Sequence, residues 1–211
     1  MTIYGKNTAQ IAKTGAVTLR CNTRPDTELM QQLSDGDIDS LGELYLRYGK
    51  LVSHAVIAAY PGFTTDAVED TCHDVFLAIA HAAPRYREQG KLKSWIYSVA
   101  VRTAKKRARS RFVRDRLLRS LKGLPVAVSP PRSVPEMVST SRFDLDRAFR
   151  SLTATQRQVI LLFEMEGLSG EEIAEMLDIK LNTVWSHLRR ARERMMNALD
   201  HQDTPPQGGR R

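Results

Sequence analysis

Residues 169–194, SGEEIAEMLDIKLNTVWSHLRRARER, constrain the fold most, because they join the start signal of one short helix to a second, basic helix. Ser169 and Glu172 form the capping-box pattern, in which a hydroxyl and a carboxylate satisfy free N–H groups at the start of a helix. An apolar stripe at helical spacing follows, breaks and resumes, at Ile173, Ala174, Leu177, Val184 and Leu188. The stretch therefore predicts a helix-turn-helix.

The second helix of this motif carries aromatic, polar and cationic side chains on its outward face, at Asn182, Trp185, Ser186, His187, Arg189, Arg190, Arg192 and Arg194. Such groups read base edges and hold phosphates. An ordinary amphipathic hairpin could also have a basic face, but the capping box, the small Ala174 and the short turn in this order favour DNA binding. Asp178 stands where the turn favours glycine, and Lys180 stands where a Ser or Thr cap would stabilise the second helix.

The charge of the chain limits its partners. It has 211 residues, a formal net charge of +8 and a pI of about 9.7, which indicates nucleic acid, with an anionic membrane surface as the alternative. No apolar run approaches the ~18 residues of a spanning helix, and residues 1–15 lack a signal-peptide core. We therefore expect a cytoplasmic protein that does not insert into membranes.

The cysteines point to no cofactor. Cys21 and Cys72 are too few and too far apart in sequence for a disulfide framework, and the adjacent Cys72 and His73 lack further ligands at metal spacing. We expect no metal and no cofactor, and we interpret Cys72 as a small, partly buried hydrophobic residue.

Helical periodicity accounts for nearly the whole chain, and nothing in the pattern calls for a strand. We expect helices over 26–33, from 37 to just before Pro61-Gly62, over 65–82 and from about 91 onward, and later one capped by Thr153 and Gln156. A stretch rich in proline and serine interrupts them. The predicted organisation is all-α: a flexible tail over 1–24, a helical domain over 25–119, a linker over 120–140, a second helical domain over 141–199, and a flexible tail over 200–211.

A second nucleic-acid feature lies in the helix that begins near Lys91. Its end is strongly basic, with cations at Arg102, Lys105, Lys106, Arg107, Arg109, Arg111, Arg114, Arg116 and Arg119, and we interpret this run as a phosphate-binding surface rather than a solvated helix end. The preceding loop combines cations with an aromatic ring, at Arg85, Tyr86, Arg87 and Lys91, a mixture that suits unstacked bases. Trp95 and Tyr97 also fit the domain core, which for Trp95 is the favoured interpretation.

The helix over 65–82 has the opposite charge. Asp66, Glu69, Asp70 and Asp74 lie beside the apolar Val75 and Phe76. The helix dipole accounts for acids in the first turns but not for Asp74. An acidic, partly apolar face on a basic chain predicts a protein-docking surface.

Together these segments resemble the bacterial extracytoplasmic-function sigma factors. DAVEDTCHDVFLAIA (66–80) is similar to the helix of that family that binds core RNA polymerase, and KLKSWIYSVAVRTAKKRAR (91–109) to its helix that reads and melts the −10 element. Residues 152–195 are similar to its −35-binding domain. The likeness spans about Asp26 to Leu199 apart from the linker, and it implies the region 2 and region 4 domains of that family.

The resemblance also implies roles for residues. Glu69, Asp70, Asp74 and Phe76 would meet core polymerase, whose clamp helices and flap the family contacts. The loop over 85–92 would capture a flipped −10 base, and the −10 contacts would come from Arg85, Tyr86, Arg87, Lys91, Trp95, Tyr97, Arg102, Lys105, Lys106 and Arg109. The −35 contacts would come from Arg157, Asn182, Trp185, Ser186, His187, Arg189, Arg190 and Arg192. An anti-sigma protein is a further partner that the family implies.

The sequence departs from the family pattern at Arg102, His73, Trp185 and Asp178, where asparagine, glutamine, a basic or polar residue and glycine are frequent. The function implied is promoter-specific transcription initiation by a protein that is not an enzyme. The alternative is a free-standing helix-turn-helix regulator, which would leave the segments over 66–119 without a use. A small nuclease would need carboxylates that hold Mg²⁺, and a purely structural helical protein would not need two basic faces.

Overall fold

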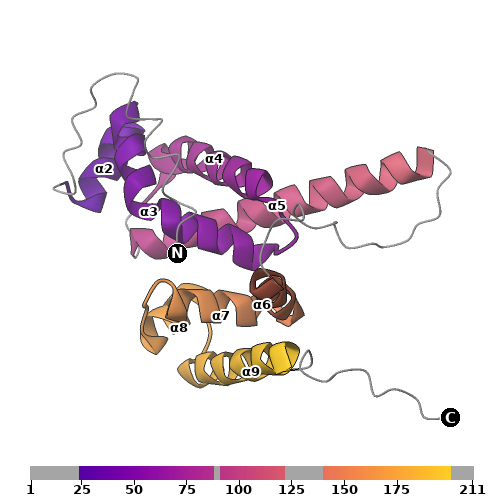
Figure 1. Ribbon diagram of the computed structural model, residues 1–211. Coiled ribbons are helices and arrows are strands. Elements are labelled where there is room, and N and C mark those ends of the chain that lie inside the picture. Colours follow the sequence, from indigo (N-terminus) through magenta and orange to yellow (C-terminus); the bar gives the residue numbers. More distant parts are fainter. Residues whose placement is uncertain (1–23, 88–90, 122–139, 201–211) are drawn as a thin grey trace, which may run out of the picture.

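The computed structural model describes residues 24–87, 91–121 and 140–200, and these form two groups of helices (Figure 1). The described residues contain no strand, which confirms the all-α fold class. The predicted tails and most of the predicted linker lie outside the described residues. The predicted domain boundaries therefore stay predictions.

The first group contains α2 (Asp26–Ser34), α3 (Ile38–Ala59), α4 (Thr65–Ala82) and α5 (Leu92–Leu121). These bounds follow the predicted helices closely. Two differences occur: a short 3-10 helix, Ala83–Arg85, forms inside the predicted loop, and α5 continues past the predicted end of the domain at 119. The core between the helices is aliphatic, with fully buried side chains at Leu44, Val52, Val75, Ile79 and Ile96.

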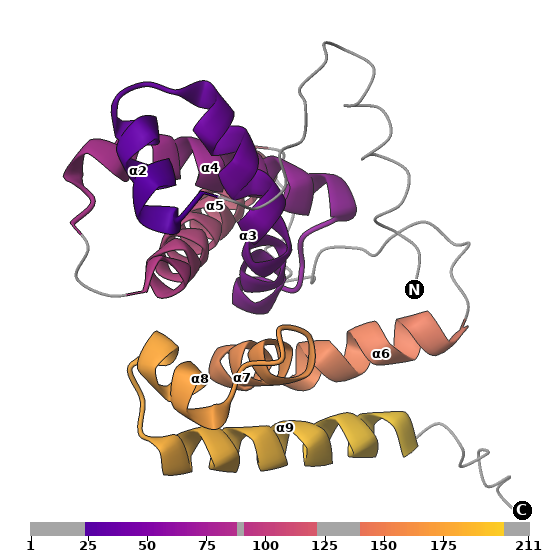
Figure 2. The same ribbon diagram turned by 90° about the vertical axis from the view of Figure 1, so that its left-hand side faces the viewer.

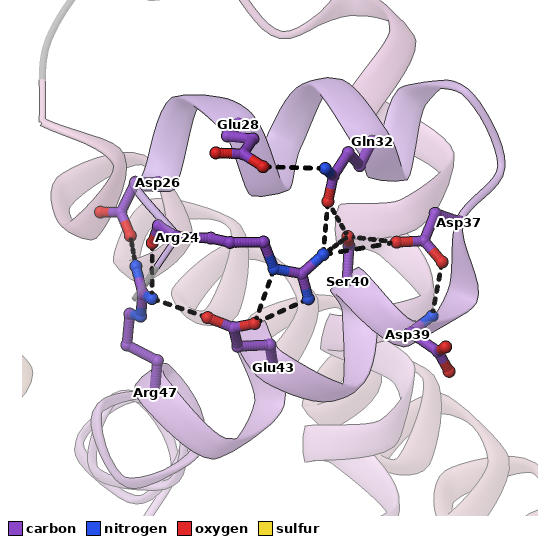
Figure 3. A network of polar contacts seen from close by, with 9 residues as sticks. All are labelled: Arg24, Asp26, Glu28, Gln32, Asp37, Asp39, Ser40, Glu43 and Arg47. Atoms are coloured by element: carbon purple, nitrogen blue, oxygen red, sulfur yellow. Dashed lines mark hydrogen bonds and ion pairs between the residues drawn. The ribbon is translucent and has the colours of Figure 1, made fainter. Parts of the chain in front are cut away.

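A polar network joins α2 to α3 (Figure 3). Arg24 donates to Glu43 through Nη2 at 2.7 Å, and Arg47 donates to the other carboxylate oxygen of Glu43 at 3.0 Å. The Ser40 hydroxyl donates to Asp37 at 2.6 Å. These links hold the start of the described chain against the first half of α3, and they lower the pKa of the Asp37 carboxyl, chiefly through the Ser40 hydrogen bond.

The second group contains α6 (Thr140–Ser151), α7 (Ala154–Glu164), α8 (Gly170–Leu177) and α9 (Leu181–Asp200). Both predicted capping boxes are present: Thr153 with Gln156 begins α7, and Ser169 with Glu172 begins α8. The sequence pattern predicted α7, from its cap at Thr153, but did not predict α6 before it. The structure separates them because Thr153 adopts an extended backbone and caps a new helix.

The turn of the predicted helix-turn-helix has the left-handed residue that the pattern called for. Asp178 has φ 53° and ψ 52°, a conformation that glycine adopts at less cost. The N–H of Ile179 donates to the Ala174 carbonyl at 3.0 Å, which closes the end of α8. The departure to Asp at this position is therefore accommodated with the turn intact.

The two groups contact each other along α3 and α7, and the second group lies against one side of the first (Figure 2). His54 Nδ1 lies 2.6 Å from Glu166 Oε1, with the two side chains 10% and 11% exposed. The Arg157 Nε donates to the Ala58 carbonyl at 2.9 Å. At the other end of the contact, Lys91 pairs with Glu175 at 3.0 Å. Polar and charged groups thus contribute to this contact, beside buried apolar residues that form one cluster across both groups.

Candidate nucleic-acid interface

The predicted docking acids share one exposed side of α4. Glu69, Asp70 and Asp74 are exposed, and we call these three residues the acidic surface. Phe76 is different: it is 4% exposed and packs under Tyr45, with ring centroids 4.8 Å apart. The predicted direct contact of Phe76 with a partner is therefore not available in this structure, because its ring belongs to the domain core.

Arg107 of α5 lies against the acidic surface. Its guanidinium donates to Asp70 at 2.9 Å and also to Asp74. The predicted phosphate-binding run included Arg107, but the fold turns this one cation toward α4. Sequence spacing alone could not reveal the pairing, since it depends on how α4 and α5 pack.

The remaining cations of α5 form a stripe on another side of the helix. Arg102, Lys105, Lys106 and Arg109 are all exposed, and their spacing places them on one face; we call them the basic stripe. Trp95 begins this face two turns earlier and is half-buried, as the favoured core interpretation allows. An aromatic start followed by cations on one face suits a nucleic-acid strand.

Tyr97, also predicted for −10 DNA, points the other way. It is 2% exposed, and burial raises the pKa of its hydroxyl above the ordinary value. Two residues along a helix turn the side chain through more than half a circle, so Tyr97 enters the core while Trp95 stays at its edge. Tyr97 therefore supports the site from within and does not line it here.

The described residues of the predicted capture loop combine exposed cations with an aromatic ring, as the sequence indicates. Arg85, Arg87 and Lys91 are exposed, and Tyr86 packs on Trp95 with ring centroids 4.8 Å apart. Residues 88–90, the centre of this loop, lie outside the described residues. Lys91 pairs with Glu175 of the second domain, and the hydrogen bond in this pair raises the pKa of the Lys91 ammonium.

Most of the predicted −35 residues are exposed on α9, on the side away from its buried Val184, Leu188 and Ala191. The exposed ones are Asn182, Trp185, Ser186, Arg189, Arg190 and Arg192. His187 is only half-exposed, with a buried Nδ1 that has no hydrogen-bond partner among the described residues. The structure thus brings the residues predicted from a single motif onto one surface.

Two of the arginines on α9 are held by acids. Arg189 pairs with Glu193 at 2.6 Å on the same helix, and Arg192 pairs with Glu164 of α7 at 2.6 Å. The guanidinium of Arg192 also lies over the Phe163 ring, 5.5 Å from its centroid. These exposed pairs are weak in water, so a phosphate can displace them.

Arg157 does not lie on this surface. It is 9% exposed, and its donors reach the carbonyls of Ala58, at 2.9 Å, and Leu152, at 2.5 Å. Burial lowers the pKa of its guanidinium. The predicted phosphate contact of Arg157 is unavailable in this arrangement, because the side chain lies between the two domains. Sequence reasoning missed this contact, since Arg157 and Ala58 are 99 positions apart.

Two family models match the chain in the positions of the two helical groups. Residues 44–112 match Sigma-70 region 2, and residues 142–195 match Sigma-70, region 4. The part of the chain between them is matched by neither model. The two matches include the acidic surface, the basic stripe and α8 with most of α9.

Curated proteins and solved structures agree with these models. The ECF RNA polymerase sigma-E factor of Escherichia coli is 30% identical over 184 residues, which cover 82% of this chain and 94% of that protein. The RNA polymerase sigma factor CnrH of Cupriavidus metallidurans is 27% identical over 83% of this chain and 94% of that protein. The structure of CnrH with the cytosolic domain of CnrY has a TM-score of 0.58, at 21% identity over 85% of this chain and 99% of that chain. The sigma factor RpoE of Bartonella quintana with the anti-sigma factor NepR has a TM-score of 0.55, at 23% identity over 77% and 97% of the chains.

Proposed function

The chain belongs to the extracytoplasmic-function sigma factors of bacterial RNA polymerase, and from that premise we propose how its domains divide the work of initiation. As an alternative sigma factor, it binds core RNA polymerase and directs it to promoters. The observation that carries this function is the presence of both region 2 and region 4 in one chain that also aligns along most of its length with a known member.

We infer that the acidic surface of α4 docks on the polymerase. Asp70 and Asp74 are exposed and face outward beside Arg107, which holds them in the absence of a partner. An exposed pair of this kind is worth under about 1 kcal/mol, so cationic side chains of a partner can replace Arg107 at little cost. Phe76 contributes by supporting Tyr45 from the core.

Promoter opening would use the basic stripe and the capture loop. The basic stripe would hold the backbone of the −10 strand, while Arg85, Arg87 and the Tyr86–Trp95 ring pair would receive an extruded base. Extruding a base costs a few kcal/mol, and stacking on an aromatic ring returns roughly 1–3 kcal/mol. The protein therefore opens DNA by binding the open form, and we propose that it forms or breaks no covalent bond itself.

The −35 element would lie against α9. The polar face at Asn182, Ser186 and Arg189 would meet base edges, and Arg190 and Arg192 would reach phosphates. Arg157 would join them only after the two domains separate, because its guanidinium now lies against Ala58. The proposed −35 residues of α9 are thus exposed in the present arrangement, whereas Arg157 would first have to leave its contact with Ala58.

An anti-sigma protein is a further partner that we propose. The sigma factor RpoE of Bartonella quintana was solved in complex with the anti-sigma factor NepR, and CnrH was solved in complex with the cytosolic domain of CnrY. No helix among the described residues is long and apolar enough to span a membrane. We place the action of the protein in the cytoplasm, where the polymerase transcribes.

Transcription in a purified system tests this division of work. Core polymerase with the full chain should start transcripts from a subset of genomic fragments that core alone ignores. Lys105→Ala with Lys106→Ala, and separately Trp95→Ala, should lose promoter opening, measured by permanganate reactivity of unpaired thymines, while polymerase binding survives. If the lysine pair loses polymerase binding instead, the basic stripe is not the melting surface. If the chain ignores polymerase and shifts duplex DNA alone, it is a free-standing regulator.

A further inference from the structure

Gly170 is an unexpected residue for its place in the fold. It is the first residue of α8 and is buried, and glycine in a helix is less favourable than alanine. Its φ does not lie in the left-handed region, since among the described glycines only Gly36 and Gly167 do. A requirement for space, rather than for backbone freedom, therefore explains the glycine.

Trp185 occupies the space that a side chain at position 170 would need. A Cβ at position 170 would lie 2.6 Å from Trp185 Cζ2 and 2.9 Å from Leu181 Cδ1, distances at which atoms overlap. The indole also meets the Phe163 ring edge-on, with centroids 5.9 Å apart and planes at 77°. Gly170 and Phe163 thus form a seat that holds the indole in one orientation.

Part of the seated indole remains open to solvent. Trp185 is 43% exposed, and helical spacing places it next to Asn182 and Arg189 on the outward side of α9. A large apolar surface held rigidly beside polar recognition groups is suited to an apolar feature of DNA. In the major groove, only thymine presents one, its C5 methyl group.

We propose that Trp185 is a specificity-determining residue that packs on the C5 methyl of a thymine in the −35 element. This inference rests on the proposed function, because it requires α9 to enter the major groove. A phosphate contact through the indole N–H is the competing role, but the exposed arginines of α9 already supply stronger donors for phosphates. Contact with a methyl group uses the exposed apolar surface of the indole, which the neighbouring polar side chains of Asn182 and Arg189 lack.

Replacing thymine by deoxyuridine tests the contact, because it removes the methyl group and nothing else. A −35 sequence would first be selected from a randomised promoter library by core polymerase carrying the full chain. Each −35 thymine would then be replaced singly and promoter affinity measured. We expect about a fourfold loss at one position for the wild type, the loss expected for one buried methyl group, no loss for Trp185→Lys, and a partial loss for the conservative Trp185→Phe.

The inference is overturned if the wild type tolerates deoxyuridine at every −35 position, or if Trp185→Lys is as sensitive as the wild type. Those results would leave the sigma function untouched, provided that the holoenzyme still transcribes the selected promoter. Failure of the wild type to transcribe any promoter with core polymerase would instead remove the proposed function itself.

The seat has its own test in Gly170→Ala. In the wild-type chain this change should lower the melting temperature, because the new methyl displaces the indole. In a Trp185→Ala chain the same change should lower the melting temperature much less, because only the methyl end of the Leu181 side chain, 2.9 Å from the new Cβ, then has to move. An equal fall in both chains would show that the indole does not occupy this space, and it would remove the basis of the proposal.

Discussion

The acidic surface of the first domain and the recognition surface of the second differ in how their charges are held. Arg107 reaches Asp70 and Asp74 across 37 and 33 positions of the chain, so the acidic surface depends on how α4 packs on α5. On α9, Arg189 pairs with Glu193 four positions away, and Arg192 is the exception, since it pairs with Glu164 of α7. Both ends of α8 are closed by neighbours in sequence. The first surface is a product of tertiary packing, whereas the second is largely local.

The difference indicates which parts of the molecule are sensitive to which changes. The second domain is small, and small domains bury a smaller share of their surface on folding. The loss of one buried contact should therefore take a large part of its stability. A surface built by long helices tolerates the loss of single contacts better, but its charges can be rearranged by a partner. Core, cap and charge changes should therefore affect the two domains unequally.

The largest effect should come from the core of the second domain. Ile173 is fully buried, and Ile173→Ala should lower the free energy of unfolding by about 2–5 kcal/mol. For a small domain this is most of the available stability, so −35 binding should be lost while polymerase binding through α4 persists. Thermal melting by circular dichroism together with a polymerase pull-down measures both.

Met196→Ala is the matched control for this change, because Met196 is 62% exposed on α9. It should change stability by less than about 0.5 kcal/mol. Equal loss of −35 and polymerase binding in Ile173→Ala would contradict the comparison, since it would mean that the two domains unfold as one.

A smaller effect should distinguish the helix caps of the two domains. Thr153 and Gln156 bond each other's backbone at the start of α7, and Gln156 is 3% exposed. Thr64 caps α4 with a single bond to the Ala67 N–H, at 3.3 Å. Thr153→Ala with Gln156→Ala, which removes both bonds, should cost about 1–2 kcal/mol, and Thr64→Ala, which removes one, about 0.5–1 kcal/mol in urea unfolding. A larger loss of unfolding free energy for Thr64→Ala would contradict the comparison, because it would mean that the first domain depends more on its local cap than the second domain does.

The smallest effect should be a pH dependence at the start of α8. The hydrogen bond from the Ser169 N–H lowers the pKa of the Glu172 carboxyl below its ordinary value. The lowered pKa means that this contribution to stability is present above the unfolded-state pKa, about 4.3, and is lost as the pH falls through the folded value. Urea unfolding between about pH 5 and pH 3 should show this loss in the wild type. Glu172→Gln should remove this part of the pH dependence of the unfolding free energy. An unchanged pH dependence in this variant would contradict the role given to the Glu172 carboxyl.

The same local character explains what could be predicted from sequence. Both capping boxes, the left-handed Asp178 and the bounds of α2, α3 and α4 depend on residues a few positions apart, and all were predicted. The exposed face of α9 follows from the periodicity of its buried residues. These features belong to single helices and turns, and periodicity and capping residues in the sequence predict such features.

What could not be predicted depends on packing between distant segments. Arg157 reads as a free cation until α3 is placed against α7, and Arg107 reads as part of the basic run until α4 is placed against α5. Tyr97 could have been assigned to the core, because it lies off the face that Trp95 shares with the basic stripe. Gly170 carried a signal as well, since a glycine in the first turn of a predicted helix calls for a reason of space or conformation.

The docking of α4 on core RNA polymerase is the claim on which the rest depends, and a native pull-down tests it most directly. Purified core polymerase should retain the wild-type chain but not Asp70→Lys with Asp74→Lys. Asp35→Lys with Asp39→Lys is the matched control, because it makes the same change of charge at exposed acids at the end of α2 and in the first turn of α3. The account predicts that this control binds like the wild type. Retention of the Asp70 and Asp74 double variant at wild-type affinity would contradict it.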